Sequence, residues 1–207
     1  MTGKKKVYGV GINDVPGSSE TTCYIKWSST LKRCYDTKWI QKYRPTYVNA
    51  TVCDEWLTYS NYKAFYDANY FEGAVLDKDI LFPGNKHYSP HTCVFVPEFI
   101  NLIVVCNPPK GGKLFGTRKV ENGYKAVITI TGQSVTLKDD NGNDTFATEY
   151  EAHRHWQSVK GQHLVVAAEQ YKNEYPNNFN QDVYDQLLWK AQIILEDIEN
   201  NRPTYRY

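Results

Sequence analysis

The chain has 207 residues, of which 41% are hydrophobic and 14% aromatic, and this content suits one large or two small folded domains. It excludes a chain that is disordered throughout. Because 24 basic residues nearly balance 23 acidic ones, net charge gives no reason to expect a polyanionic partner, and only local clusters of charge can indicate one.

Cysteine usage and hydropathy indicate a reduced, soluble protein. Five cysteines are spread along the sequence without a Cys-x-x-Cys pair, a pattern typical neither of a disulfide framework nor of a zinc ribbon. No run of about 18 apolar residues is present, and the basic N-terminus lacks the apolar segment of a signal peptide. We therefore expect an intracellular protein without a membrane partner.

Two amphipathic helices are expected in the first third of the sequence. In residues 24–35, Trp27, Leu31 and Cys34 recur at helical spacing, with basic residues on the opposite face. Residues 56–70 repeat this period with an aromatic face. We interpret both faces as parts of a core, with ligand binding as the alternative.

The next segment has the pattern strand, polar loop, helix. Residues 73–82 are typical of a strand, and residues 83–85, Pro-Gly-Asn, are typical of a turn. Residues 97–104 indicate a helix with proline in its first turn.

A domain boundary is expected near the middle of the chain. Residues 106–113, Cys-Asn-Pro-Pro-Lys-Gly-Gly-Lys, interrupt helix and strand alike, because adjacent prolines and glycines support neither. This boundary gives an N-terminal domain of residues 1–107 and a C-terminal domain of residues 108–207.

The second domain begins with three strand-like runs, in residues 111–120, 124–130 and 135–137. The pair Asn122-Gly123 between the first two runs is a strong hairpin signal. A helix packed on the resulting three-stranded sheet follows from the order of the elements.

Two helices complete the predicted chain. Thr148 and Glu151 have the spacing of a capping box, which opens a long helix that ends at about Tyr171. Its inner face is expected to contain Ala152, Trp156, Val159, Val166 and Ala167. A last amphipathic helix over residues 182–200 offers an apolar face, which docks either onto its own domain or onto a second copy.

One constellation of residues extends over the polar loop and its flanks. It consists of Leu76-Asp-Lys-Asp-Ile-Leu, Gly84-Asn-Lys, Tyr88-Ser-Pro, Thr92-Cys-Val-Phe-Val-Pro and Asn101. These residues resemble the core of the phage HNH homing endonucleases, a branch of the His-Me finger nucleases. The segments Trp27 to Tyr35 and Val52 to Tyr62 resemble what precedes that core. Tyr124 to Ile130 and Phe146 to Ala152 resemble the three-stranded, Apetala-type DNA-binding module that such enzymes often carry.

The resemblance covers about residues 24–171 and implies a fold and a function. The implied fold is α+β: a ββα-metal unit with flanking helices, then a three-stranded antiparallel sheet packed on a helix, and a C-terminal helix. The implied function is hydrolysis of phosphodiester bonds in double-stranded DNA, assisted by Mg²⁺ or another divalent cation. The implied location is the cytoplasm of an infected bacterial host, with virion association as an alternative.

The same resemblance assigns candidate catalytic residues. Asp77 corresponds to the carboxylate that binds the metal in the family, and Asn101 corresponds to the last metal ligand. Carboxylate and amide oxygens are the hard ligands that suit magnesium. A base, a metal clamp and a polarising residue within a few ångströms are what phosphodiester hydrolysis requires.

The sequence departs from the family at two positions. Lys78 stands where the family has its base histidine, and Thr92 falls roughly where the loop asparagine is expected. A lysine with an ordinary pKa of about 10.4 is protonated at pH 7 and cannot accept a proton, although Lys78 can contact phosphate, or act as the catalytic base if burial lowers its pKa substantially. His87 or His91 could supply the missing imidazole from the loop.

A plain structural interpretation stands beside the catalytic one. Asp77 and Asp79 can alternate outward on an exposed strand while Asn85 makes the turn and Asn101 lies on a helix surface. For His153, His155 and His163 we expect a solvated helix face rather than a metal cluster, because positions two apart on a helix face different ways.

DNA contact is expected from the basic residues of the predicted sheet domain. Arginine can hydrogen-bond to guanine edges while lysine contacts phosphates. The candidate DNA-binding residues are Lys110, Lys113, Arg118, Lys119, Tyr124 and Lys125. The alternative to an active endonuclease is a catalytically inactive, HNH-derived DNA-binding or accessory protein of a phage particle or complex. A homo-oligomer is also compatible with the sequence.

Overall fold

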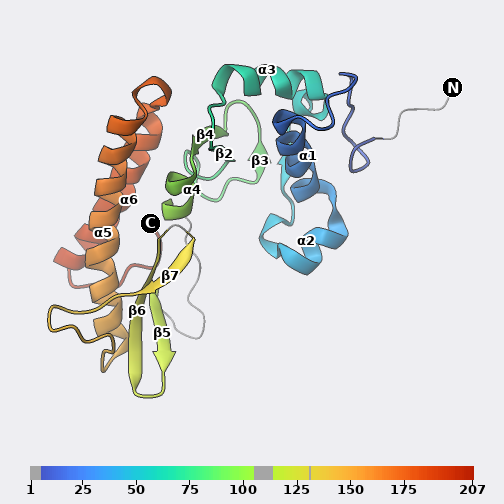
Figure 1. Cartoon of the computed structure of the whole chain (residues 1–207). Coiled ribbons are helices and arrows are strands. Elements are labelled where there is room, and N and C mark those ends of the chain that lie inside the picture. The colour runs from blue at the N-terminus through green and yellow to red at the C-terminus, as the bar shows by residue number, and fades with distance from the viewer. Residues whose placement is uncertain (1–5, 105–113, 131) are drawn as a thin grey trace. The chain divides into compact units, whose positions relative to one another are not determined.

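The computed structural model describes residues 6–104, 114–130 and 132–207, which form two compact units, Met1–Val96 and Pro97–Tyr207 (Figure 1). The boundary expected after residue 107 lies inside the second unit. The reason is that helix α4 (Glu98–Val104), which precedes that boundary, packs against strand β6 (Gly123–Ile130) and helix α5 (Glu149–Glu174).

The described part of the first unit contains three α-helices, and both predicted helices are found. Helix α1 (Thr22–Tyr35) begins where the Thr21 hydroxyl accepts a hydrogen bond from the Tyr24 amide at 3.2 Å. A short helix α2 (Thr37–Tyr43) follows. Helix α3 (Tyr59–Asn69) is shorter than expected, because the residues before it form a separate 3-10 turn, η2 (Glu55–Leu57). A second 3-10 turn, η1 (Pro45–Tyr47), follows α2.

Aromatic side chains form the core of the first unit. Trp27, Trp56, Tyr59 and Tyr62 are each no more than 1% exposed. The indole N–H of Trp27 donates to the Trp56 carbonyl at 2.6 Å, so the polar atom of this large side chain is satisfied within the core. The interpretation of both aromatic helix faces as core is confirmed.

The strands of the first unit are short. Strand β1 (Thr51–Val52) pairs in parallel with β3 (His87–Tyr88), and β2 (Ala74–Asp77) pairs with β4 (Val94–Pro97). The predicted strand over residues 73–82 is therefore only partly formed. It ends at Asp77 because this side chain accepts backbone hydrogen bonds from the two residues that turn the chain away, Asp79 and Ile80.

The second unit has the predicted sheet-and-helix arrangement. Strands β5 (Thr117–Val120), β6 and β7 (Gln133–Thr136) form an antiparallel sheet in that order, and α5 packs against β5 and β6. The capping box of Thr148 and Glu151 is present, with both hydrogen bonds formed. Helix α6 (Gln181–Glu199) packs along α5, which confirms docking onto its own domain. The fold is therefore of the α+β class.

Two expectations about α5 are wrong. Val166 was placed on the inner face but is 62% exposed, because the buried stripe instead continues through Leu164 and Ala168. His153 was expected on a solvated face but is fully buried. Its Nδ1 lies 2.7 Å from the Phe115 carbonyl, whereas Nε2 of His155 lies 2.9 Å from a different carbonyl, that of Lys138, so the two imidazoles do diverge as expected.

The residues after α6 return to cover α5. Thr204 is fully buried, and its backbone N–H donates to Nε2 of His153 at 2.9 Å. The Thr204 hydroxyl donates to Asp197 at 2.8 Å and accepts from the Gln157 amide at 2.9 Å. A buried polar network thus joins this segment to both long helices.

The approach of the chain to β5 is fixed by one glycine. Gly116 has a φ of +68°, and a Cβ atom built on it would lie 2.0 Å from the Trp156 ring of α5. Only glycine satisfies both the left-handed backbone and this close approach. Among the described helices, none combines the length and apolar character needed to cross a membrane.

Candidate functional site

Asp77, the predicted metal carboxylate, stands at the end of β2 and is 9% exposed. Its Oδ1 accepts the amides of Asp79 and Ile80 at 2.7 and 2.6 Å. Burial raises the pKa of the carboxyl group, and the two amide hydrogen bonds oppose that effect. This oxygen therefore closes a turn in the chain, as it would in a purely structural role.

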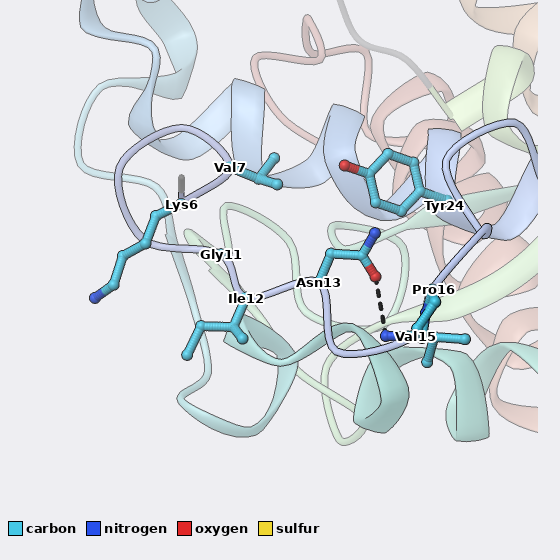
Figure 2. Close-up of a pocket in the computed structure, with 8 residues that line it drawn as sticks. All are labelled: Lys6, Val7, Gly11, Ile12, Asn13, Val15, Pro16 and Tyr24. Carbon is cyan, nitrogen blue, oxygen red and sulfur yellow. Dashed lines mark hydrogen bonds between the residues drawn. The ribbon is translucent and has the colours of Figure 1, made fainter. Parts of the chain in front are cut away.

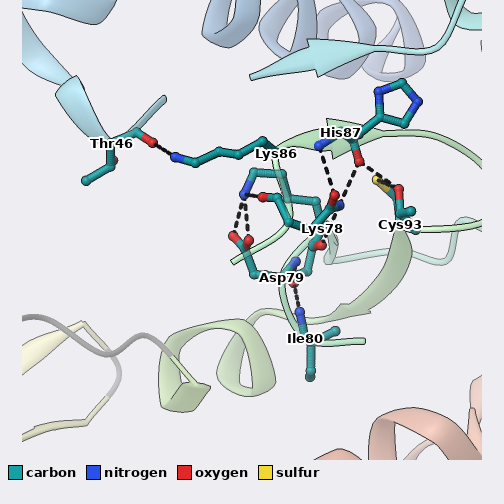
Figure 3. A network of polar contacts seen from close by, with 10 residues as sticks. Thr46, Lys78, Asp79, Ile80, Lys86, His87 and Cys93 are labelled. Atoms are coloured by element: carbon teal, nitrogen blue, oxygen red, sulfur yellow. Dashed lines mark hydrogen bonds and ion pairs between the residues drawn. The ribbon is translucent and has the colours of Figure 1, made fainter. Parts of the chain in front are cut away.

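Lys78, at the position of the family's base histidine, is 7% exposed and is held from several sides (Figure 3). Its ammonium donates to Oδ1 and Oδ2 of Asp79 at 2.6 and 2.7 Å and to the Asn85 carbonyl at 2.7 Å. It also lies 5.7 and 5.9 Å from the ring centroids of Tyr47 and Tyr88. The Lys78 ammonium is the donor in each of these hydrogen bonds.

Asn85 organises the loop through its side chain. Its amide nitrogen donates to the carbonyls of Lys78 and His87 at 3.0 and 2.7 Å, and its Oδ1 accepts the His87 amide at 2.9 Å. The hydroxyl of Thr92 also donates to the His87 carbonyl, at 2.7 Å. The loop is therefore ordered by side-chain to backbone hydrogen bonds, whereas the sequence predicts only a turn at Asn85.

The two loop histidines are not joined to Asp77. The imidazole of His87 points away from Lys78 and Asp79 in Figure 3, and its Nδ1 lies 2.8 Å from the Thr51 hydroxyl. His91 is exposed. Neither histidine makes a hydrogen bond to Asp77 or Lys78 in the part of the chain that the structure describes. That His87 or His91 acts as a general base therefore stays a prediction, which no contact in the described residues supports.

The predicted metal ligands belong to different units. Asp77 lies in the first unit, and Asn101 is a half-buried residue of α4 in the second. Within residues 6–104, 114–130 and 132–207, no group of three histidine, cysteine or acidic side chains could hold a metal ion. Because Oδ1 of Asp77 already accepts two amides, the donor set around it does not fit a metal ion on that oxygen.

The sheet of the second unit separates the predicted DNA-binding residues onto two faces. Ala126 and Ile128 of β6 are buried, which marks the face toward α5. Since side chains alternate along a strand, the pair Arg118 and Lys125 lies on the outer face, and the pair Lys119 and Tyr124 lies on the face toward α5. Lys110 and Lys113 lie outside the described residues.

Polar side chains surround Arg118 on the outer face. Its guanidinium donates to the Thr136 hydroxyl at 3.3 Å. Lys125 makes an ion pair with Asp144 at 2.6 Å, which lowers the pKa of that carboxyl group. The register of β6 with β7 adds further residues to this face, namely Val127, Thr129, Ser134 and Thr136. The outer face therefore has two cationic side chains, Arg118 and the ion-paired Lys125, and three hydroxyls on adjacent strands.

A hollow of about 500 Å³ lies in the first unit beside the segment before α1 (Figure 2). Its walls are mainly apolar, and the Asn13 side chain in it accepts hydrogen bonds from the Val15 amide at 3.2 Å and the Ser18 hydroxyl at 3.1 Å. None of the predicted site residues lines it. Lys6 and Tyr24 are the ionisable side chains that line it, and no carboxylate, histidine or cysteine of the described residues does.

A scan against protein-family models found no match, and searches among curated proteins and solved structures found none either. The resemblance to phage HNH endonucleases therefore rests on the quoted motifs and on the order of the elements.

Proposed function

We propose that the chain binds double-stranded DNA through the outer face of the sheet β5–β6–β7. The observation that carries this proposal is the placement of Arg118 among the hydroxyls of Thr129, Ser134 and Thr136 on one exposed sheet face. Arginine and hydroxyl side chains on adjacent strands can donate to phosphates and to base edges. Two- and three-stranded sheets are narrow enough to enter a DNA groove.

We further propose that the chain acts without cleaving DNA, as an HNH-derived binding or accessory protein. Lys78 supports this part, because its ammonium only donates hydrogen bonds where the resembling enzymes have a histidine that accepts a proton. The turn-forming contacts of Asp77 support it as well. A phage origin and a place in the infected cell or the virion remain parts of this proposal.

The test of DNA binding compares two neighbouring residues of β5. Arg118→Ala should weaken binding to duplex DNA and reduce the slope of log affinity against log salt by about 0.9, the value for one phosphate contact. If Arg118 instead contacts a base, the loss should depend on sequence at about 1–3 kcal/mol. Lys119→Ala removes the same charge from the other face and should change the affinity little. Equal losses in both variants, or no binding of the wild type at low salt, would overturn the proposal.

DNA cleavage is the second candidate, favoured by one specific observation. The order of β2, β4 and α4, with Asp77 ending the first strand and Asn101 in the helix, is the order of the ββα unit. Incubation of supercoiled plasmid with the protein and Mg²⁺ or Mn²⁺ tests it. Nicking that is lost in Asn101→Ala and kept in Asn69→Ala would support this candidate. Intact plasmid with both metals would exclude it for that DNA.

A further inference from the structure

Three basic side chains of the first unit gather around Tyr47 and Tyr88. Lys78 lies over both rings at 5.7 and 5.9 Å, and Arg33 of α1 interacts with both tyrosines. The ammonium of Lys86 donates to the carbonyl of Thr46, the neighbour of Tyr47 (Figure 3). Three separate segments of the chain therefore bring a positive charge to the neighbourhood of Tyr47.

The charges of this cluster are not balanced by carboxylates. Asp79 pairs with Lys78, but no carboxylate of the described residues lies within 4 Å of Arg33 or Lys86. Two positive charges without a carboxylate partner therefore remain in the cluster, on the half-buried Arg33 and the exposed Lys86, together with that of the buried Lys78. An anion bound among these side chains is attracted by all three charges.

Asp79 occupies the position that such an anion would take. Both of its oxygens accept hydrogen bonds from Lys78, as the oxygens of a phosphate can. Its side chain is nevertheless 49% exposed, so it can rotate into solvent without moving the buried part of the cluster. An incoming anion could therefore replace it on the ammonium.

We propose that Arg33, Lys78 and Lys86 form a binding site for a phosphate group of a nucleic-acid backbone, which displaces the carboxylate of Asp79. Arginine presents several N–H donors in a planar fork that matches phosphate oxygens, and lysine adds charge. Lys78 then contributes a phosphate contact where the resembling enzymes have a base. The assignment of this phosphate to a nucleic acid rests on the proposed function. The phosphate site itself does not depend on DNA binding by the sheet β5–β6–β7.

The test titrates the full chain with inorganic phosphate and follows lysine and backbone NMR signals. Lys86→Met should lower the affinity for phosphate several-fold, because one charge-assisted contact is lost. Asp79→Asn should raise the affinity, because the competing carboxylate is gone while its shape is kept. Both substitutions are at surface positions, so they test the site even if Lys78→Met fails to fold.

The matched controls are Lys63→Met and Asp67→Asn, which remove the same charges from an exposed ion pair of α3. They should change the affinity less than twofold, since they alter only the long-range field. An equal effect of Asp79→Asn and Asp67→Asn, or signal changes confined to residues outside the cluster, would overturn the phosphate site.

A second arm identifies the source of the phosphate. Lys86→Met should reduce the salt slope of duplex DNA binding by about 0.9, in addition to the effect of Arg118→Ala. If phosphate binds at the cluster but the DNA slope is unchanged, the assignment to nucleic acid is wrong. Failure of Arg118→Ala to affect DNA binding would count against the sheet proposal alone, so the two failures are distinguishable.

Discussion

The backbone N–H of Thr204 donates a hydrogen bond to Nε2 of His153 at 2.9 Å. This contact fixes the state of the ring, because a nitrogen that accepts an N–H cannot carry a proton of its own. The other nitrogen, Nδ1, must then be the one that donates to the Phe115 carbonyl at 2.7 Å. The segment after α6 is therefore attached to α5 through a neutral histidine.

This attachment predicts a loss of stability in mild acid. Burial lowers the pKa of His153 below the value of about 6.5 that an unfolded histidine has, and only the hydrogen bond to Phe115 and nearby carboxylates oppose it. The unfolded state therefore takes up the proton first. The contribution of His153 to the free energy of unfolding should be constant above about pH 7.5 and fall as the pH decreases through about 6.5 toward the lower folded pKa.

Urea unfolding of the wild type and His153→Gln between pH 5 and 8 measures this effect. The variant should lack part of the decrease in stability on the acid side. Partial burial also lowers the pKa of His163, which contributes in the same direction, so His163→Gln is the control for this half-buried histidine. Identical pH dependence in the wild type and His153→Gln would contradict the role of His153.

Asp77→Ala should destabilise the first unit by about 1–2 kcal/mol, because the amides of Asp79 and Ile80 lose their acceptor. Asp77→Asn keeps an oxygen at the same place and should cost clearly less. Thermal or urea unfolding measures both. A loss in Asp77→Asn as large as in Asp77→Ala would mean that the negative charge, rather than the hydrogen bonds, holds the turn.

Gly116→Ala should destabilise the second unit by about 2–4 kcal/mol, because a Cβ atom would collide with the Trp156 ring in addition to straining the backbone. Gly132→Ala is the matched control. Its φ is +80°, but nothing lies within 4 Å of the added atom, so only the backbone cost of about 1 kcal/mol applies. Similar losses in the two variants would show that the ring moves aside freely.

The elements that the sequence predicts well are those set by local patterns. The capping box at Thr148, the helical period around Trp27 and the hairpin signal of Asn122-Gly123 each act over a few residues, although the turn itself lies at residues 121–122. Strand alternation also implies that Arg118 and Lys119 face opposite ways. That Arg118 lies opposite Lys125 could be known only from the register of β5 and β6. The turn at residues 121–122 sets this register.

The rest depends on contacts between distant parts of the chain. His153 is buried because the segment after α6 folds over it, and nothing near His153 in the sequence indicates that cover. Strand β2 ends at Asp77 because a side chain competes with the sheet for backbone hydrogen bonds. The cluster around Tyr47 combines residues 33, 78 and 86, so spacing in any one segment could not predict it.

The close approach of Gly116 to Trp156 also limits how this sequence can change over time. A relative with a larger residue at position 116 is expected to carry a smaller one at position 156, since the two cannot be enlarged together. Such a paired substitution would preserve the packing of β5 against α5. Coupled variation at these two positions would then identify distant relatives that keep this sheet domain even where its surface charges have diverged.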